Sequence, residues 1–190
     1  QVWNEINYST SYAPLMLVQK APIPLLQFVP SETVDTIILA ASTVIRATQG
    51  IALVALLAAW VQPGAVPRER IAALLLGAYL VTQSPGGYTQ VFLIFLVFLE
   101  PWRRPGPIVA LICAYLLCLV GDIPLSTILE LSTPSWLSGR PVGPAFRLTI
   151  GHFVCPAVIA LLVWALAPDT IAQSIRAHRG QRPILGLAPA

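Results

Sequence analysis

Arg46 is the residue whose type and position most strongly suggest chemistry, because it lies inside the long apolar stretch 34–62. A guanidinium at the middle of a membrane helix costs about 2.5 to 3.5 kcal/mol on insertion scales, so such residues usually face a partner or a water-filled cavity. We therefore expect Arg46 to bind a phosphate or carboxylate group of a substrate that enters from the membrane. The alternative is that Arg46 lies nearer an interface and extends its guanidinium to the headgroups.

The second candidate site is the loop 84–90, which reads SPGGYTQ. Non-helical backbone at membrane depth is stable only where protein or a water-lined cavity satisfies its polar groups. We expect the amides of Gly86 and Gly87 to approach an anion, with the positive end of a helix that begins at Tyr88 beside them. The alternative is a simple outer turn between two short helices.

Two carboxylates lie in the longest polar connection, 121–147. Unstructured loops of this length are uncommon and tend to be functional. Asp122 and Glu130 are the candidate catalytic residues, since a carboxylate can serve as general base toward a sugar hydroxyl. Asp122 is equally suited to capping a short surface helix expected over 123–131.

Basic residues are expected at the outer entry of the last apolar stretch, where Arg140, Arg147 and His152 are candidates for substrate binding. Arg147 and His152 would be about 140° apart around a helix, so only a looser arrangement brings both to one ligand. His152 is also a weaker candidate for ligating a pigment or haem. No cofactor or metal is expected, because the cysteines lie in apolar runs without a metal-ligand spacing such as C-x-x-C.

The composition places these residues in a lipid bilayer. Charged residues make up 10% of the 190 residues and hydrophobic residues 56%, whereas an average soluble protein carries about 25% charged residues. So few charges cannot cover the surface of a soluble globule of this size. An ordinary soluble enzyme, a disordered chain and a nucleic-acid binder with clustered basic residues are therefore excluded.

Five apolar stretches predict an all-α integral membrane protein. A bilayer core about 30 Å thick needs about 20 apolar residues as a helix. The expected segments cover 34–62, 71–83, 88–99, 107–121 and 148–167, with an outer loop over 122–147. The second and third are short, and they form either a helical hairpin with SPGG at its turn or one broken helix.

The basic residues favour the hairpin, because cytoplasmic loops are enriched in Arg and Lys. The turns PRER (67–70) and PWRR (101–104) flank the hairpin, and both would be cytoplasmic. We therefore expect an outer N-terminus and a cytoplasmic basic tail over 168–190, in a bacterial inner membrane. Residues 1–33 are expected to form an interfacial segment on the outer face. Their export would need a leader or an earlier span, so we expect the C-terminal part of a larger protein.

The stretch 82–91 (TQSPGGYTQV) resembles the small-Pro-x-x-Tyr pattern that opens a late span in C-type membrane glycosyltransferases. These enzymes use polyprenyl-phosphate-linked sugars and include bacterial family 87 mannosyltransferase-like proteins. The similarity extends through the following apolar segment to PWRR. Thr89 stands where an acid would be expected after the tyrosine. The family's catalytic carboxylate lies in an early outer loop, which would precede Gln1 if this chain is a C-terminal part.

The resemblance implies a lipid-linked sugar donor, transfer at the outer face, and a lipid or glycan acceptor. Arg46, Arg140 and Arg147 would then contact phosphate. This assignment rests on their positive charge and on the side of the membrane where they are expected, and not on a motif match. Two other functions stay open. One is a non-catalytic transmembrane subunit that packs against other transmembrane subunits in a larger complex. The other is half of a transporter whose site is a helix broken at SPGG. The expected partners are membrane lipids and either a lipid-linked sugar or other subunits, and no nucleic acid.

Overall fold

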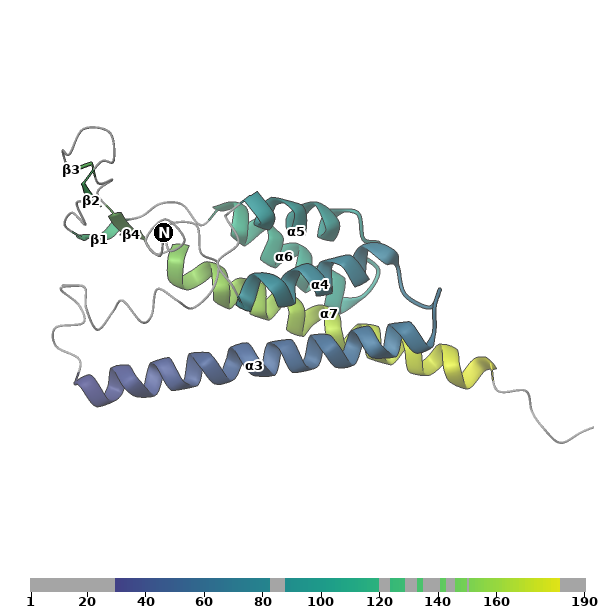
Figure 1. The fold of residues 1–190 in the computed structure, drawn as a ribbon. Coiled ribbons are helices and arrows are strands. Elements are labelled where there is room, and N and C mark those ends of the chain that lie inside the picture. The colour runs from purple at the N-terminus through teal and green to yellow at the C-terminus, as the bar shows by residue number, and fades with distance from the viewer. Residues whose placement is uncertain are drawn as a thin grey trace, which may run out of the picture.

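The structure is a computed structural model that describes residues 30–82, 88–119, 124–128, 133–134, 141–142, 146–149 and 151–181. Within these ranges the chain is mostly helical, as expected. The helices are α3 (Ser31–Val61), α4 (Arg68–Thr82), α5 (Tyr88–Phe98), α6 (Pro105–Leu119) and α7 (Gly151–Gln181), and Figure 1 shows α3 and α7 as the two long ones. Of the proposed interfacial segment, 1–29 lies outside the described residues.

The long helices α3 and α7 run in the same direction. Trp164 Nε1 donates a hydrogen bond to Thr48 Oγ1 at 2.9 Å. Further along both helices, Gln62 Nε2 and His178 Nδ1 lie 2.9 Å apart. Since the residue numbers rise together on the two helices, α3 and α7 are parallel and enter and leave the bundle at the same ends.

The helices α4 and α5 form an antiparallel hairpin. Arg70, in the first turn of α4, forms hydrogen bonds with Glu100, which follows the end of α5. One continuous broken helix would have placed these two residues at opposite ends. The turns 67–70 and 101–104 therefore lie at one end of the bundle, which is the arrangement that the hairpin predicts.

The helix α7 is central, because it contacts α3, α4 and α6. Two glycines let its neighbours approach closely. A Cβ at Gly77 would lie 2.6 Å from Val163 Cγ2, and a Cβ at Gly106 would lie 2.5 Å from the Ala165 carbonyl oxygen. Large apolar side chains fill the core around these contacts: Leu74, Leu80, Leu93, Ile159, Leu162 and Leu166.

Two helices in the described part of the chain are long and apolar enough to cross a membrane, over Asp35–Val61 and Val154–Gly180. The others have 15, 11 and 15 residues in α4, α5 and α6. At 1.5 Å per residue they cover about 16 to 22 Å, less than a bilayer core of about 30 Å. The five membrane segments therefore stay a prediction.

The last helix is longer than expected. Its apolar stretch was predicted to end at Ala167 before a basic tail, yet α7 continues through Pro168 to Gln181. A proline removes one backbone donor, but it does not end a helix whose neighbours hold it in place. Asp169, directly after Pro168, forms an ion pair with Arg70 of α4 and so holds this part of α7 against the bundle.

Short strands occupy part of the outer loop. β1 (Pro124–Ile128) pairs antiparallel with β4 (Phe146–Thr149), and β2 (Thr133–Pro134) pairs with β3 (Pro141–Val142). The surface helix expected over 123–131 is wrong, because 124–128 is a strand. Its β-branched Thr127 and Ile128 suit a strand, and proline is tolerated at a strand's first position. β4 leads almost directly into α7 (Figure 1).

Candidate functional site

A charged cluster joins three helix ends, the start of α4, the end of α5 and the start of α6, to the interior of α7. It lies at the end of the bundle that carries the basic turns 67–70 and 101–104, which we call the basic end. Arg70 contacts Glu100 through Nε and Nη2, and its Nη1 donates to Asp169 Oδ2 at 3.1 Å. Arg104, next to the start of α6, lies 3.5 Å from Asp169 Oδ1. Arg70 and Glu100 are almost fully buried, with 2% and 4% of their surfaces exposed. We call these four residues the charge cluster.

The charge cluster is suited to holding helices together rather than to proton transfer. Both carboxylates face guanidinium groups, so their oxygens are already engaged in ion pairs between helices. A buried ion pair contributes little net stability, but removal of one partner costs about 3 to 5 kcal/mol because a charge is left without compensation. The cluster therefore fixes α4, α5 and α6 on α7.

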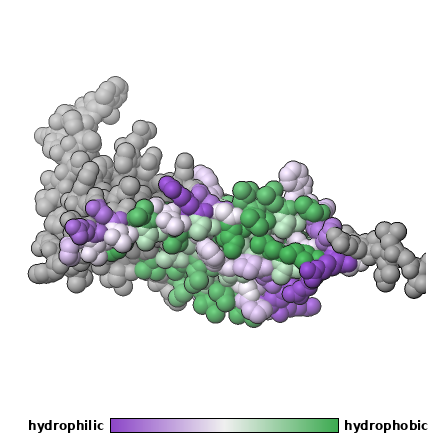
Figure 2. Space-filling model, turned by 90° about the horizontal axis from the view of Figure 1, so that it is seen from below, coloured by the Kyte–Doolittle hydropathy of each residue, from purple (hydrophilic) through white to green (hydrophobic). Residues whose placement is uncertain are grey.

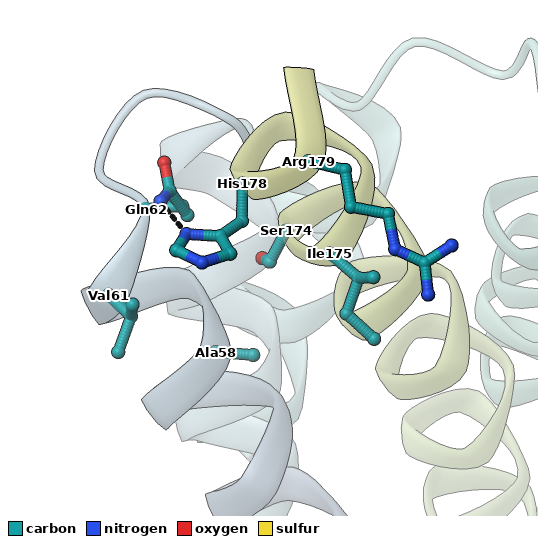
Figure 3. Close-up of a pocket in the computed structure, with 7 residues that line it drawn as sticks. All are labelled: Ala58, Val61, Gln62, Ser174, Ile175, His178 and Arg179. Atoms are coloured by element: carbon teal, nitrogen blue, oxygen red, sulfur yellow. Dashed lines mark hydrogen bonds between the residues drawn. The ribbon is translucent and has the colours of Figure 1, made fainter. Parts of the chain in front are cut away.

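A pocket with both polar and apolar lining lies beyond the charge cluster, between the last turns of α3 and α7. It has a volume of about 460 Å³. Figure 3 shows its lining residues: Ala58, Val61, Gln62, Ser174, Ile175, His178 and Arg179. The Ser174 side chain is buried, and its hydroxyl oxygen has no hydrogen-bond partner in the described part of the chain. We call this the end pocket.

Arg46 is exposed on α3 and makes no ion pair with any residue that the structure describes. It lies among apolar side chains that are also exposed, including Leu39 and Leu53. Gly50, one turn further along, is exposed too, and nothing lies within 4 Å of where its Cβ would be. This stripe, with Leu57, is called the α3 face.

Other predicted site residues lie at the opposite end of the bundle. Arg147 is in β4, where it pairs with Thr127 of β1, and His152 is in the first turn of α7. Tyr88 is the first residue of α5. Asp122, Glu130, Gly86, Gly87 and Arg140 lie outside the described residues.

The described candidates are only partly brought together. Arg147 and His152 lie close in the chain, where β4 meets α7. Arg46 lies far from them. It is two positions before Thr48, whose hydroxyl accepts a hydrogen bond from Trp164. Trp164 lies about 12 residues, or 18 Å, along α7 from His152. No group of three or more His, Cys, Asp or Glu side chains that could hold a metal occurs in the described part of the chain.

A second, apolar groove of about 420 Å³ separates α3 and α7 near their middle. It is lined by Thr43, Val44, Ala47, Ala157, Ala160, Leu161 and Trp164. The groove offers small side chains and only one hydroxyl, so it has shape but no reactive group. The Trp164 indole is held at its edge by the hydrogen bond to Thr48.

Sequence reasoning missed both the charge cluster and the end pocket. The signals were present: each basic turn, and the start of the tail, carries an acid on the same predicted side. Ser174, Ile175, His178 and Arg179 follow the i, i+1, i+4, i+5 spacing of one helix face. The pocket was missed because the tail was not expected to continue α7.

Comparisons of the chain with models of known protein families, with curated proteins and with solved structures found no match.

Proposed function

We propose that this chain is an integral membrane protein and acts as a non-catalytic subunit that packs against a partner transmembrane helix. The observation that carries the proposal is the α3 face, an apolar helix surface that displays Arg46 and Gly50. The membrane is proposed to be a bacterial inner membrane, with the basic end of the bundle in the cytoplasm.

Membrane embedding is supported by the distribution of apolar side chains. Phe92 and Phe95 of α5 and many side chains of α3 and α6 are large, apolar and exposed. Figure 2 shows apolar residues over the middle of the face seen from below and hydrophilic residues gathered where α3 and α7 finish. A contiguous apolar surface of this kind is unfavourable in water and favourable against lipid.

The subunit role is supported by Gly50. An exposed glycine inside a helix costs about 0.5 to 1 kcal/mol relative to alanine, and in the described part of the chain nothing packs within 4 Å of where a Cβ of residue 50 would lie. Glycines on membrane helices commonly allow a second helix to approach closely. The proposed occupant of the α3 face is therefore a helix of another membrane protein, seated over Gly50.

Arg46 specifies the chemistry of that partner. It is exposed on the same side of α3 as Leu39 and Leu53. A guanidinium held against hydrocarbon strongly favours an acidic counter-ion. We therefore propose that the partner helix carries a carboxylate that pairs with Arg46, so that charge and close packing act on one surface.

The test is site-specific photocrosslinking in the native membrane. A photoreactive residue at Leu53 or Leu57 is expected to give one protein adduct of defined mass, and Arg46→Leu or Gly50→Leu is expected to abolish it. The control is a photoreactive residue at Phe95, on α5, which should crosslink to lipid. If all three positions crosslink only to lipid, the α3 face has no protein partner and the subunit proposal is wrong.

The second candidate is a glycosyltransferase-like function at the outer face, acting on polyprenyl-phosphate-linked sugars. The observation that favours it is the pairing of β1 with β4, which fixes Arg147 near the start of α7, where His152 lies. Asp122 stands two positions before Pro124, the first residue of β1. Arg147 and His152 are the candidates for binding the donor phosphate, and Asp122 is the candidate general base for the acceptor hydroxyl.

The enzyme and the subunit are distinguished by sugar transfer and by the crosslink at the α3 face. Purified chain with a radiolabelled polyprenyl-phosphate sugar and native membrane lipids should transfer the sugar, and Asp122→Asn and Arg147→Gln should each reduce the transfer. Glu69→Gln, at the opposite end, is the matched control. No transfer by the unaltered chain, with the α3 face crosslink intact, would exclude the enzyme and retain the subunit.

A further inference from the structure

The end pocket combines a buried, unpartnered hydroxyl with basic side chains at the rim. Ser174 is 3% exposed, and its hydroxyl oxygen has no hydrogen-bond partner within the described ranges. Figure 3 shows this hydroxyl on the side of α7 that faces α3. A buried hydroxyl without a partner costs free energy, so it indicates a missing group with which it would pair.

The neighbouring side chains determine the kind of group. His178 and Gln62 are hydrogen-bonded to each other at 2.9 Å, which holds the imidazole at the mouth of the pocket. With Gln62 as donor to Nδ1, the other ring nitrogen is a donor and is free to bind an acceptor. Arg179 adds a positive charge, and no acidic side chain lines the pocket. All these groups favour an anion.

The remaining lining is apolar and comes from Ala58, Val61 and Ile175. A free inorganic anion gains nothing from such surface, whereas the glycerol and first methylenes of a lipid do. Trp60, on the same turn of α3, is 79% exposed. Exposed tryptophans at the end of a membrane helix mark the headgroup level.

We propose that the end pocket binds the headgroup of an anionic phospholipid, with its phosphate near Ser174, His178 and Arg179 and its chains along α3. The proposal rests on membrane embedding but not on the partner helix. Basic pockets between membrane helices on the cytoplasmic side are suited to such headgroups. Arg70 does not contribute, because Glu100 and Asp169 neutralise it.

The test uses the full chain purified in uncharged detergent. Phosphatidylglycerol, phosphatidylcholine with the same acyl chains, and sodium phosphate are added separately, and bound lipid is measured by native mass spectrometry alongside the thermal midpoint. Phosphatidylglycerol is expected to bind and raise the midpoint. Arg179→Gln should weaken phosphatidylglycerol binding about fivefold, which corresponds to the contribution of one basic residue near an anionic headgroup. Arg176→Gln, which is exposed on α7 outside the pocket, is the matched control and should change nothing.

Ser174→Ala separates binding from folding. Because the hydroxyl has no partner among the residues that the structure describes, the substitution should leave the midpoint without lipid unchanged or raised. It should nevertheless weaken phosphatidylglycerol binding about tenfold, the value of a hydrogen bond to a charged group. Equal binding of phosphatidylcholine, an equal effect of phosphate alone, or unchanged binding in Ser174→Ala would overturn the proposal.

Failure of this site is distinguishable from failure of membrane embedding. Native membranes are washed with alkaline carbonate, which releases peripheral proteins. A chain that stays in the membrane but shows no preference for phosphatidylglycerol refutes the end pocket alone. A chain released by the wash refutes membrane embedding and with it both proposals.

Discussion

Neutralising Glu100 is the sharpest test of how the bundle is held together. In Glu100→Gln the side-chain shape is kept while the negative charge that faces Arg70 is lost. Arg70 is 2% exposed, so it cannot recover the lost interaction by hydration. Removing one partner of a buried pair costs about 3 to 5 kcal/mol. Asp169 remains 3.1 Å from the guanidinium, so we expect a loss near the lower end, about 3 kcal/mol.

The assay is reversible unfolding of the purified chain in mixed micelles by rising dodecyl sulfate, followed by tryptophan fluorescence. Glu69→Gln is the matched control, because Glu69 neighbours Arg70 in α4 but forms no ion pair among the described residues. A surface change of this type should stay within about 0.5 kcal/mol. A loss in Glu100→Gln no larger than in Glu69→Gln would refute the role of the charge cluster.

A double substitution then tests whether the loss comes from an uncompensated charge. Arg70→Met alone leaves Glu100 buried without its cation, and should be as costly as Glu100→Gln. Combining the two removes both charges of the pair. The combined loss should be smaller than the sum of the single losses by about 1 to 3 kcal/mol, the usual coupling of contacting residues. Additive losses would mean that the two side chains act separately.

Three further outcomes are expected. Gly106→Ala should destabilise the chain by about 1 to 3 kcal/mol, because the added methyl group overpacks against Ala165. Gly50→Ala, where the added methyl group meets open space, should stabilise the chain by about 0.5 to 1 kcal/mol. Equal effects of the two substitutions in denaturant titrations would contradict the close approach of α6 to α7. Thr48→Val should cost about 1 to 2 kcal/mol, with an altered Trp164 emission, because the indole loses its acceptor; unchanged emission would contradict this bond. Cysteines at Ala65 and Arg103, in a chain without native cysteines, should react with an impermeant maleimide only from the cytoplasmic side of the membrane, and labelling of either from the outer side would exclude the proposed orientation.

Most of the helical architecture could be predicted from the sequence, because it depends on local pattern. The hairpin followed from the basic residues of the turns 67–70 and 101–104. A helix that begins at Tyr88, directly after SPGG, was also predicted, and α5 begins there. These features depend on neighbouring residues in the chain, so periodicity and turn residues are enough to find them.

The end of α7 and the charge cluster could not be predicted in the same way. Pro168 is a local signal for a helix end, but the ion pair of Asp169 with Arg70, which comes from α4, overrides it. The pairing of Arg70 with Glu100 joins residues 30 positions apart. Charge counting placed the two on the same side, and only the packing of α4 against α5 determines that their side chains meet.

The lengths of the helices explain why a bundle of this kind needs the charge cluster. α4, α5 and α6 cover about 16 to 22 Å, so if the bundle is embedded as proposed, in a bilayer core of about 30 Å, at least one end of each would lie below the headgroups. Polar groups at such an end are costly unless they are paired. Arg70, Glu100 and Asp169 supply that pairing where α4 begins and α5 ends. The fourth member, Arg104, is part-exposed next to α6, so the cluster leads from the buried helix ends toward water. The long helix α7 carries Asp169 to this depth and continues to the end pocket, which explains why the short hairpin depends on it.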